Sequence, residues 1–468
     1  MGSPEPNPNA ADATAAPPAV RRLWRAGTLV YTSTGLAALF GWLLWGDFAW
    51  WMKERAVAPV GQLMLRQFGA TDFLVGLLIG SVPAALGLIV GPIVSVKSDQ
   101  HRGRWGRRIP YLLIPTPFIA ISMFGMAGTV PMAMWLDQLL GLRSPGIVSC
   151  QLIVFSIFWA SFELFQTIAQ SVLGGLINDV VPTEVIGRFY GLFRAVSLGA
   201  AIIFNFWLIG YAEQHYVVIF LGLGTLFGGG FTLMCLMVKE GEYPPPTPRD
   251  TGVTLFRRVV DPVRIYFREC YSHPYYRWVF LAGMLGSIAA APVNSFSVFY
   301  AKSLGMDMTQ YGRLLAIAFS VSLVSSYFLG WLADKFHPLR LGLWALVSYA
   351  VVMLWGGFAA TTVNSFSIAF VAHVILSGVF QTGTASLGQR LYPKWQFAQF
   401  ASAAGLVASL GFLIVPPALG AFLDATGRDY RSTFFLSGGV GVVASAAFVL
   451  VLKRFRQLGG DKNYVPPQ

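Results

Sequence analysis

Residues 91–110 read GPIVSVKSDQHRGRWGRRIP, and long apolar runs flank this stretch on both sides. Five of its residues are Lys or Arg, and Asp99 and His101 add further polar groups. So much charge is too costly to lie in the hydrocarbon core of a bilayer. We therefore interpret the stretch as a tight turn between two membrane helices. Its excess of Lys and Arg predicts a cytoplasmic position by the positive-inside rule.

A weaker copy of this pattern, GWLADKFHPLR, occupies residues 330–340, again between apolar runs, and it aligns Asp334 with Asp99. A second similarity joins NDVVPTEVIGRFYG at 178–191 to QRLYPKWQFAQFAS at 389–402. Both pairs of segments fall at corresponding places in the two halves of the chain. This spacing indicates an internal repeat, with one half of the membrane helices in each copy.

The stretch at 91–110 resembles the loop G-x-L-a-D-r-x-G-r-R between helices 2 and 3 of the major facilitator superfamily. Its form D-x-x-x-x-R-W-G-R-R-x-P looks most like the glycoside–pentoside–hexuronide:cation symporters and their sucrose-transporter relatives. The resemblance covers roughly residues 25–455. It implies an all-α integral membrane protein with twelve transmembrane helices in two pseudo-symmetric six-helix bundles, the major facilitator fold.

Composition also indicates a polytopic membrane protein. The 468 residues are 55% hydrophobic and 12% charged, and the mean hydropathy is +0.60. The net charge of +12 does not indicate a nucleic-acid partner, because most Lys and Arg fall in the tails and in loops on one side. Cys150, Cys235 and Cys270 are scattered, so neither a disulfide framework nor a metal site is expected. Nothing resembles a catalytic or nucleotide-binding pattern, so we expect neither an enzyme nor a cofactor.

The apolar runs predict twelve spans, an even number that places both termini in the cytoplasm. The spans are at roughly 29–57, 71–97, 109–134, 148–178, 188–211, 217–238, 278–301, 311–333, 341–360, 366–391, 400–423 and 432–452. The predicted domains are a disordered tail (1–25), an N-terminal bundle (26–238), a cytoplasmic linker with an amphipathic segment (239–277), a C-terminal bundle (278–455) and a tail (456–468). We expect a monomer in a cell membrane, with the bacterial inner membrane as the expected location.

Ionisable and amide side chains inside the spans are candidates for function, because burying them in a membrane is costly. Asp47, Glu163, Asn294 and His373 lie roughly 20–27 Å from the cytoplasmic ends of spans 1, 4, 7 and 10, at a rise of 1.5 Å per residue. In the superfamily these four helices line the central cavity. The sequence therefore predicts a binding site near the middle of the membrane.

Side chains that share a helical face with these four residues complete the candidate site. The predicted substrate-binding residues are Asp47, Trp50, Trp51, Glu54, Trp159, Gln166, Gln170, Asn294, His373 and Gln381. Carboxylates and amides beside indole rings suit a sugar, whose hydroxyls take hydrogen bonds while its ring lies on an aromatic plane. Glu163 and Asp47 are the candidate proton carriers. The other interpretation is that these polar groups only bond neighbouring helices and that the tryptophans anchor the interface.

Two further sets of charged residues lie at the predicted cytoplasmic ends of the spans. The gating loop comprises Asp99, Arg104, Arg107 and Arg108, with Asp334 and Arg340 in the second half. Arg188 and Arg194 are assigned to a structural cluster at the inner rim, together with Asn178, Asp179 and Glu184. The sequence leaves open whether Lys53 and Arg55 face the cavity or extend to the outer interface.

These observations predict a secondary active transporter that couples protons to symport of a neutral sugar or glycoside by alternating access. Sodium is less favoured, because melibiose-permease-like sodium symporters carry an acidic pair within helix 2, where this chain has only Asp72 and Asp99 at the two ends. One alternative is an exporter of a drug or metabolite, although span 5 lacks the Gly-Pro pair typical of drug/proton antiporters. A second is a non-transporting receptor or scaffold, for which no segment offers a convincing soluble module.

Overall fold

The computed structural model describes residues 23–243, 264, 266–393 and 396–467. Residues 1–22 of the predicted tail (1–25) and most of the predicted linker lie outside the described residues. A short antiparallel hairpin, β1 (Trp24–Ala26) and β2 (Leu29–Tyr31), precedes the first helix. Within the described residues, ten helices are long and apolar enough to cross a membrane. With α1 (Ser33–Gln67) and α13 (Met308–Phe336), the described chain makes twelve crossings.

In the N-terminal half, crossing 1 is α1. Crossing 2 comprises α2 (Asp72–Gly76), η1 (Leu77–Ser81) and α3 (Val82–Gln100), and crossing 3 comprises α4 (Ile109–Leu113), α5 (Pro115–Ala127) and α6 (Thr129–Leu140), followed by η2 (Gly141–Arg143). Crossing 4 is α7 (Ile147–Val180). Crossing 5 comprises α8 (Ile186–Ile203), η3 (Phe204–Leu208) and η4 (Ile209–Tyr211), and crossing 6 is α9 (Tyr216–Met237). In the C-terminal half, crossing 7 comprises α11 (Pro274–Ile288) and α12 (Ala291–Ser303), crossing 8 is α13, and crossing 9 is α14 (Pro338–Ala359). Crossing 10 comprises α15 (Val363–Thr384) and α16 (Leu387–Leu391), and crossing 11 is α17 (Phe397–Ala425). Crossing 12 is α18 (Arg431–Gln457), which is followed by α19 (Gly460–Asn463).

The predicted bounds of the first span are wrong at both ends. Helix α1 begins at Ser33, because the Thr32 hydroxyl accepts a hydrogen bond from the Gly35 amide at 3.1 Å and caps the helix. The residues before it pair in the hairpin instead. At the other end the helix runs on to Gln67. The charged residues at 53–55 lie inside the helix, where neighbouring helices bury Lys53 and partly bury Glu54 and Arg55, and they do not mark its end.

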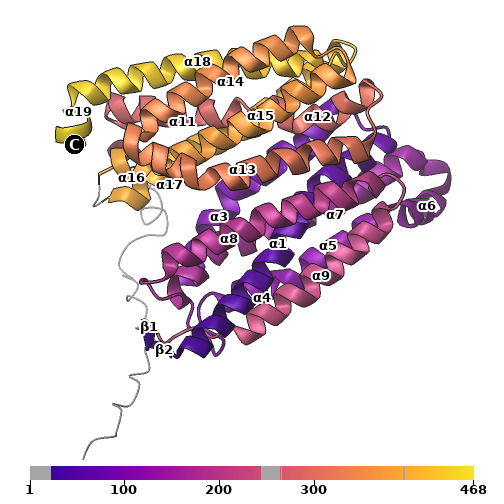
Figure 1. Ribbon diagram of the computed structural model, residues 1–468. Helices are drawn as coiled ribbons and strands as arrows, with labels where there is room; N and C mark the ends of the chain where they lie inside the picture. The colour runs from indigo at the N-terminus through magenta and orange to yellow at the C-terminus, as the bar shows by residue number, and fades with distance from the viewer. Residues whose placement is uncertain (1–22, 244–263, 265, 394–395, 468) are drawn as a thin grey trace, which may run out of the picture.

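The two halves pack their helices in the same way (Figure 1). In the N-terminal half α1 packs on α8 and α9, α5 on α7 and α9, and α3 on α7. In the C-terminal half α11 packs on α17 and α18, α14 on α15 and α18, and α13 on α15. Each contact between two crossings in the first half thus recurs between the corresponding crossings in the second. The predicted all-α fold with two pseudo-symmetric bundles is confirmed.

The halves meet where crossing 5 packs on crossing 8 and crossing 2 packs on crossing 11. These approaches are close enough to require glycine. A Cβ atom on Gly312 would collide with the backbone of Asn205, and one on Gly420 would collide with the backbone of Asp72. We call this end of the molecule the closed end. The opposite end, which carries the loop at 101–108 and the residues after α9, we call the basic end.

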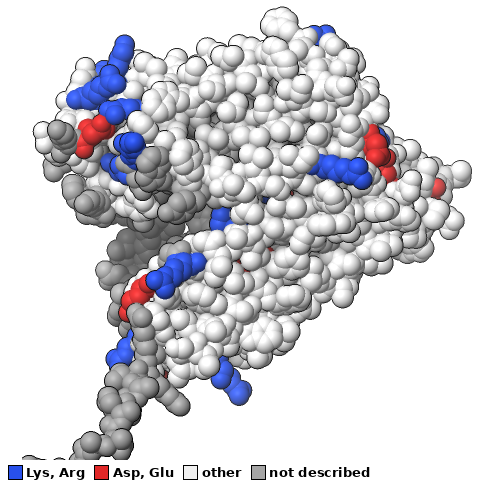
Figure 2. Space-filling model, viewed as in Figure 1, with Lys and Arg blue, Asp and Glu red and all other residues white. Residues whose placement is uncertain are grey.

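Charged side chains gather toward the two ends of the face shown in Figure 2, with a broad band between them that is largely free of Lys, Arg, Asp and Glu. Exposed apolar side chains such as Ile157, Val351 and Ile414 lie within the long helices. This distribution matches a protein whose middle faces hydrocarbon and whose ends face water and lipid headgroups.

Candidate functional site

Three polar side chains form a hydrogen-bonded triangle in the middle of the N-terminal half. Lys53 Nζ donates to Gln166 Oε1 at 2.6 Å and lies 3.3 Å from Glu54 Oε2. Gln166 Nε2 donates to the same Glu54 oxygen at 2.9 Å. Lys53 is fully buried, and its Nζ lies 3.9 Å from the centre of the Trp50 ring. A lysine can be buried here because a carboxylate, an amide oxygen and an aromatic face replace its water.

A cavity of about 400 Å³ lies beside this triangle, between α1, crossing 2 and α7. That volume is in the range of small-molecule sites. Trp159 forms a flat wall, because its Nε1 donates to the carbonyl oxygen of Leu78 at 2.8 Å and its ring stacks on Phe155. The lining residues are Glu54, Ala58, Ile79, Pro83, Gly87, Trp159, Glu163, Gln166, Thr167, Gln170 and Ser171. Four residues of the predicted set, Glu54, Trp159, Gln166 and Gln170, therefore meet Glu163 at one cavity.

Glu163 lies in the cavity wall with only 6% of its surface exposed. It is close enough to Lys53 and Glu54 to be attracted by the first and repelled by the second. Two carboxylates therefore share one lysine at a buried place. Two ionised carboxylates close together in such a site repel each other. The net charge of Lys53, Glu54 and Glu163 is zero when one of the two carboxylates holds a proton.

A second face of α1 carries Asp47, Trp51 and Arg55 at positions i, i+4 and i+8. The Arg55 guanidinium lies 5.1 Å from the Trp51 ring centre and 5.4 Å from that of Phe319 on α13, so it projects between the two halves. Both carboxylate oxygens of Asp47, Trp51 Nε1 and Arg55 Nε are buried without a hydrogen-bond partner in the described part of the chain. Such groups are normally satisfied by water or by a ligand. Neither Lys53 nor Arg55 extends to the outer interface.

Trp50 does not line the cavity. Its ring packs on Phe227 and Phe231 of α9, between crossings 1 and 6. The reason is the helical period: a rotation of about 100° separates Trp50 from Trp51, so the two indoles point at different neighbours. The sequence analysis assigned Trp50 and Trp51 to one broad face of this helix, because spacing alone does not show that Trp50 faces α9.

The predicted residues of the C-terminal half lie apart from this cavity. His373 is buried, and both of its ring nitrogens are used: Nε2 lies 2.9 Å from Asn294 Oδ1, and Nδ1 lies 2.9 Å from the Tyr349 hydroxyl. Gln381 borders a small void of about 10 Å³ next to Ser377. His373 therefore positions Asn294 between α12 and α15, and its own nitrogens are not free to bind a ligand.

The loop at the basic end is held by ion pairs. Arg108 Nη2 lies 2.7 Å from Asp99 Oδ1, and its Nε lies 2.8 Å from Asp179 Oδ2. Arg107 Nη2 lies 2.7 Å from Asp179 Oδ1. Arg104, assigned to the gating loop from the sequence, is exposed and takes no part in these ion pairs, because Gly106 turns the loop with φ +96° and directs Arg107 and Arg108 back to α7.

Glu240 is a residue of this loop that sequence reasoning missed. Its carboxylate accepts hydrogen bonds from the backbone amides of Arg107, Arg108 and Ile109 at 3.0, 2.8 and 2.7 Å. It thereby caps the start of α4 from the segment that follows α9. The available signal was a pair of acidic residues, Glu240 and Glu242, shortly after an apolar span.

Among the residues that the structure describes, the expected inner-rim cluster does not form. Asp179 pairs with Arg107 and Arg108, as described above, and Asn178 accepts a hydrogen bond from the Tyr190 hydroxyl at 3.1 Å. Arg188 and Arg194 are exposed. Instead, the loop at 103–108 lies against the end of α7, and its Arg107 and Arg108 bind the Asp179 carboxylate.

The loop of the second half differs from that of the first. Arg340 Nη2 pairs with Asp461 Oδ2 at 2.6 Å, and His337, at φ +67°, caps α14 by accepting from the Leu339 amide through Nδ1 at 3.3 Å. The side chain of Asp334 lies outside the described residues.

The closed end is locked by a network that the sequence did not reveal. Asp72 is fully buried, 3.2 Å from Arg66 Nη1, and accepts from the Tyr430 hydroxyl at 3.1 Å. Arg428 Nε lies 3.7 Å from the same carboxylate. In return Asp424 accepts from the backbone amides at 72 and 73 at 3.0 and 2.9 Å. The two halves are therefore joined by charge at this end.

The family model of the Major Facilitator Superfamily matches residues 279–463. None of the curated proteins matches the chain. The chain is similar to the solved structure of a bacterial homolog of the human lysosomal transporter Spinster, inward-facing and unoccupied, at TM-score 0.65 and 14% identity over 92% of this chain and 99% of that one. It is also similar to a D-xylose–proton symporter (TM-score 0.61, 16% identity, 88% and 96% covered) and to a POT family transporter in complex with a thioalcohol-conjugated peptide (0.62, 15%, 92% and 97%).

At such low identities the solved structures establish the fold alone, and the expected sugar-transporter branch stays a prediction. The chain is a multi-pass membrane protein with the twelve-helix major facilitator fold along its length, and its C-terminal half matches the model of the Major Facilitator Superfamily.

Proposed function

We propose that this chain is a secondary active transporter that moves a sugar or glycoside together with protons by alternating access. The observation that carries the proposal is the cavity lined by Glu54, Glu163 and Gln166, with Lys53 buried behind it. Ionisable groups buried in the middle of a membrane are costly, and they mark substrate or ion pathways. The similarity in fold to a D-xylose–proton symporter supports this class of function.

The arrangement of the halves supports alternating access. We propose that the basic end faces the cytoplasm, since its loop is rich in Arg, and that both termini lie on that side. The Asp72 network then closes the outer side, and the structure is an inward-facing one. An outward-facing state requires that this network break. Arg107 and Arg108 then belong to the gate at the other end.

The charges at the cavity suggest how protons are coupled. Lys53 balances Glu54, which leaves Glu163 as an excess negative charge when it is ionised. A proton on Glu163 makes the wall neutral and lowers the cost of enclosing it between the closed halves. Proton binding and closure over the substrate are thereby linked. Asp47, buried without a partner, is the second candidate carrier.

The lining favours a polyhydroxyl substrate. Glu54, Gln166 and Gln170 offer hydrogen-bond acceptors and donors, and Trp159 offers a flat apolar wall. A neutral sugar is the first candidate, because Lys53 is already bound to Glu54 and Gln166 and is not free to bind an anion. An acidic sugar is the second candidate. Arg55 favours it, since this cation lies between the halves with Nε unpartnered.

Uptake into proteoliposomes under an imposed pH gradient tests the proposal. We expect a neutral mono- or disaccharide to accumulate when the outside is acidic and the accumulation to collapse with a protonophore. Arg55→Ala separates the two substrate candidates: neutral-sugar uptake should persist, whereas hexuronate uptake, if the wild type shows it, should be lost. Substrate uptake that does not depend on the pH gradient would overturn proton coupling. Proton-driven efflux of drugs or metabolites without sugar uptake would identify an exporter instead.

A further inference from the structure

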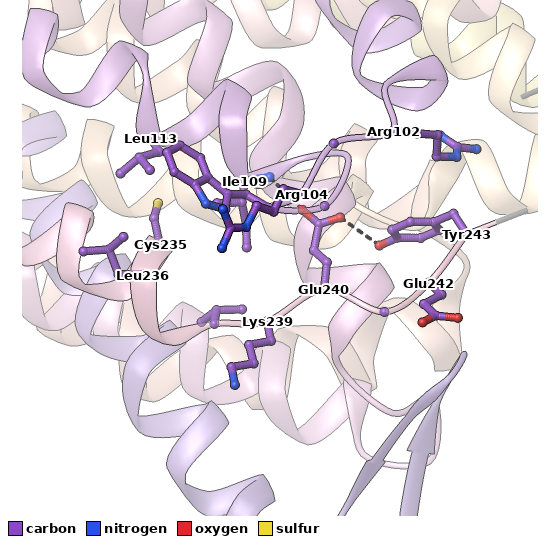
Figure 3. A pocket seen from close by; sticks show the side chains of 15 residues that line it. Arg102, Arg104, Ile109, Leu113, Cys235, Leu236, Lys239, Glu240, Glu242 and Tyr243 are labelled. Carbon is purple, nitrogen blue, oxygen red and sulfur yellow. Dashed lines mark hydrogen bonds between the residues drawn. The ribbon is translucent and has the colours of Figure 1, made fainter. Parts of the chain in front are cut away.

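A second and larger cavity, of about 670 Å³, lies at the basic end of the N-terminal half, away from the proposed transport site (Figure 3). Its walls are the loop at 102–106, the start of α4, the end of α9 and the residues that follow α9. In Figure 3, Arg104 and Lys239 lie toward Leu113 and Leu236, and Tyr243 and Glu242 lie on the opposite side. The cavity thus has one cationic and apolar side.

Two acidic residues line this cavity: Glu242 lies on the side opposite Arg104 and Lys239, and Glu240 at the centre does not cancel their positive charge. Glu240 is bound by three backbone amides at the start of α4, and the Tyr243 hydroxyl donates to its Oε2 at 2.9 Å. Its charge is therefore balanced by the helix start. Arg104 and Lys239, in contrast, are exposed and form no ion pair with any residue that the structure describes. Two cations are left to attract an anion.

The same side of the cavity continues into apolar surface. Trp105 is 57% exposed and Leu236 is 60% exposed, and Leu113 also borders the cavity. Tryptophan prefers the level of the lipid headgroups, with its ring against the acyl chains. Free cations beside an exposed indole and leucines at a helix end match a phospholipid better than a soluble anion, which would leave the apolar surface uncovered.

We propose that this cavity binds an anionic phospholipid from the leaflet at the basic end. The phosphate lies between Arg104 and Lys239, and the acyl chains run along Leu113 and Leu236. Basic pockets between membrane helices bind acidic headgroups by such contacts. The bound lipid would rest against the segment that Glu240 ties to α4, and so connect the loop at 103–108 to the end of α9.

Native mass spectrometry of the delipidated, full-length protein in detergent tests this inference. The probes are phosphatidylglycerol, phosphatidylcholine and soluble glycerol phosphate. The test variant is Arg104→Gln with Lys239→Gln, and the matched control is Lys453→Gln with Arg456→Gln, which removes the same charge from exposed positions at the end of α18. We expect tight binding of phosphatidylglycerol by the wild type and the control, and a loss of roughly 30-fold in the test variant, from two cationic contacts near the surface.

Phosphatidylcholine should bind weakly to all three proteins, and glycerol phosphate should bind weakly as well. Equal binding of phosphatidylglycerol by the test variant and the control would overturn the proposal, and so would weak binding by the wild type. Glycerol phosphate bound as tightly as the lipid would show that the site takes a soluble phosphate instead. Thermal unfolding of each variant checks that the exposed substitutions leave the protein folded.

Discussion

Asp72→Asn should shift the balance between the two states of the transporter, because Asp72 joins the halves only while the closed end is shut. Asparagine keeps the shape of the side chain and its hydrogen bond with Tyr430, but it loses the charge that faces Arg66 and Arg428. Hydrogen bonds to charged groups contribute about 1.5–3 kcal/mol, and the partial exposure of both arginines reduces the attraction. We expect a loss of about 2 kcal/mol, which is a shift of roughly 30-fold toward the state in which the closed end is open.

Double electron–electron resonance between labels at the closed end measures this shift. Leu142 and Thr361 are exposed positions on the two halves, and the native cysteines are buried and should not react with the label. The control is Glu213→Gln, which removes the partner of Lys302, a more exposed pair between the halves. Exposed pairs contribute little, so this variant should resemble the wild type. An unchanged distance distribution in Asp72→Asn would refute the role of the buried network, and so would an equal shift in both variants.

Three further predictions concern the loop, the cavity and the second half. Glu240→Gln should lower the apparent midpoint of thermal unfolding by a few degrees, since it weakens the cap on α4 by about 1 kcal/mol, whereas Glu242→Gln should not; equal midpoints would contradict the cap. Trp159→Phe should weaken sugar binding, measured by substrate protection against unfolding, and Trp50→Phe should not, because Trp50 faces α9; the reverse order would place the sugar elsewhere. Burial lowers the pKa of His337 to about 4, so the stability that its neutral form contributes is present above pH 6.5 and is lost as the pH falls toward 4; His337→Asn keeps a capping group and should flatten that part of the profile of midpoint against pH.

The sequence predicted the twelve crossings and the internal repeat, because both follow from the lengths of apolar runs and from the loop pattern around Asp99. It also predicted that Glu54, Glu163 and Gln166 belong to one site: helical spacing places Glu163 and Gln166 on one face of span 4, and the resemblance to the superfamily implies that spans 1 and 4 line one cavity. It misplaced the end of the first helix, where Lys53 and its neighbours looked like a membrane boundary. That charge can be buried because Gln166 approaches from α7 and, with Glu54 and Trp50 on α1 itself, replaces the water around Lys53.

Contacts between distant segments carried no sequence signal. Asp72 and Tyr430 are far apart in the chain, and nothing local shows that their side chains meet at the closed end. The capping of α4 by Glu240 depends in the same way on how α9 packs against the loop. Trp50 was misplaced for a smaller reason, since a shift of one residue along a helix turns an indole from the cavity to a neighbouring helix.

Proton coupling through Glu163 is the central claim. The most direct test measures substrate accumulation and substrate-dependent proton uptake together in Glu163→Gln. The variant keeps the shape and hydrogen-bonding capacity of the side chain but cannot carry a proton. In proteoliposomes with an imposed pH gradient we predict no accumulation and no substrate-dependent proton uptake, while exchange of labelled for unlabelled substrate persists. Glu184→Gln, an exposed carboxylate outside the cavity, should behave as the wild type. Accumulation against a gradient by Glu163→Gln, at the wild-type ratio of protons to substrate, would contradict the account.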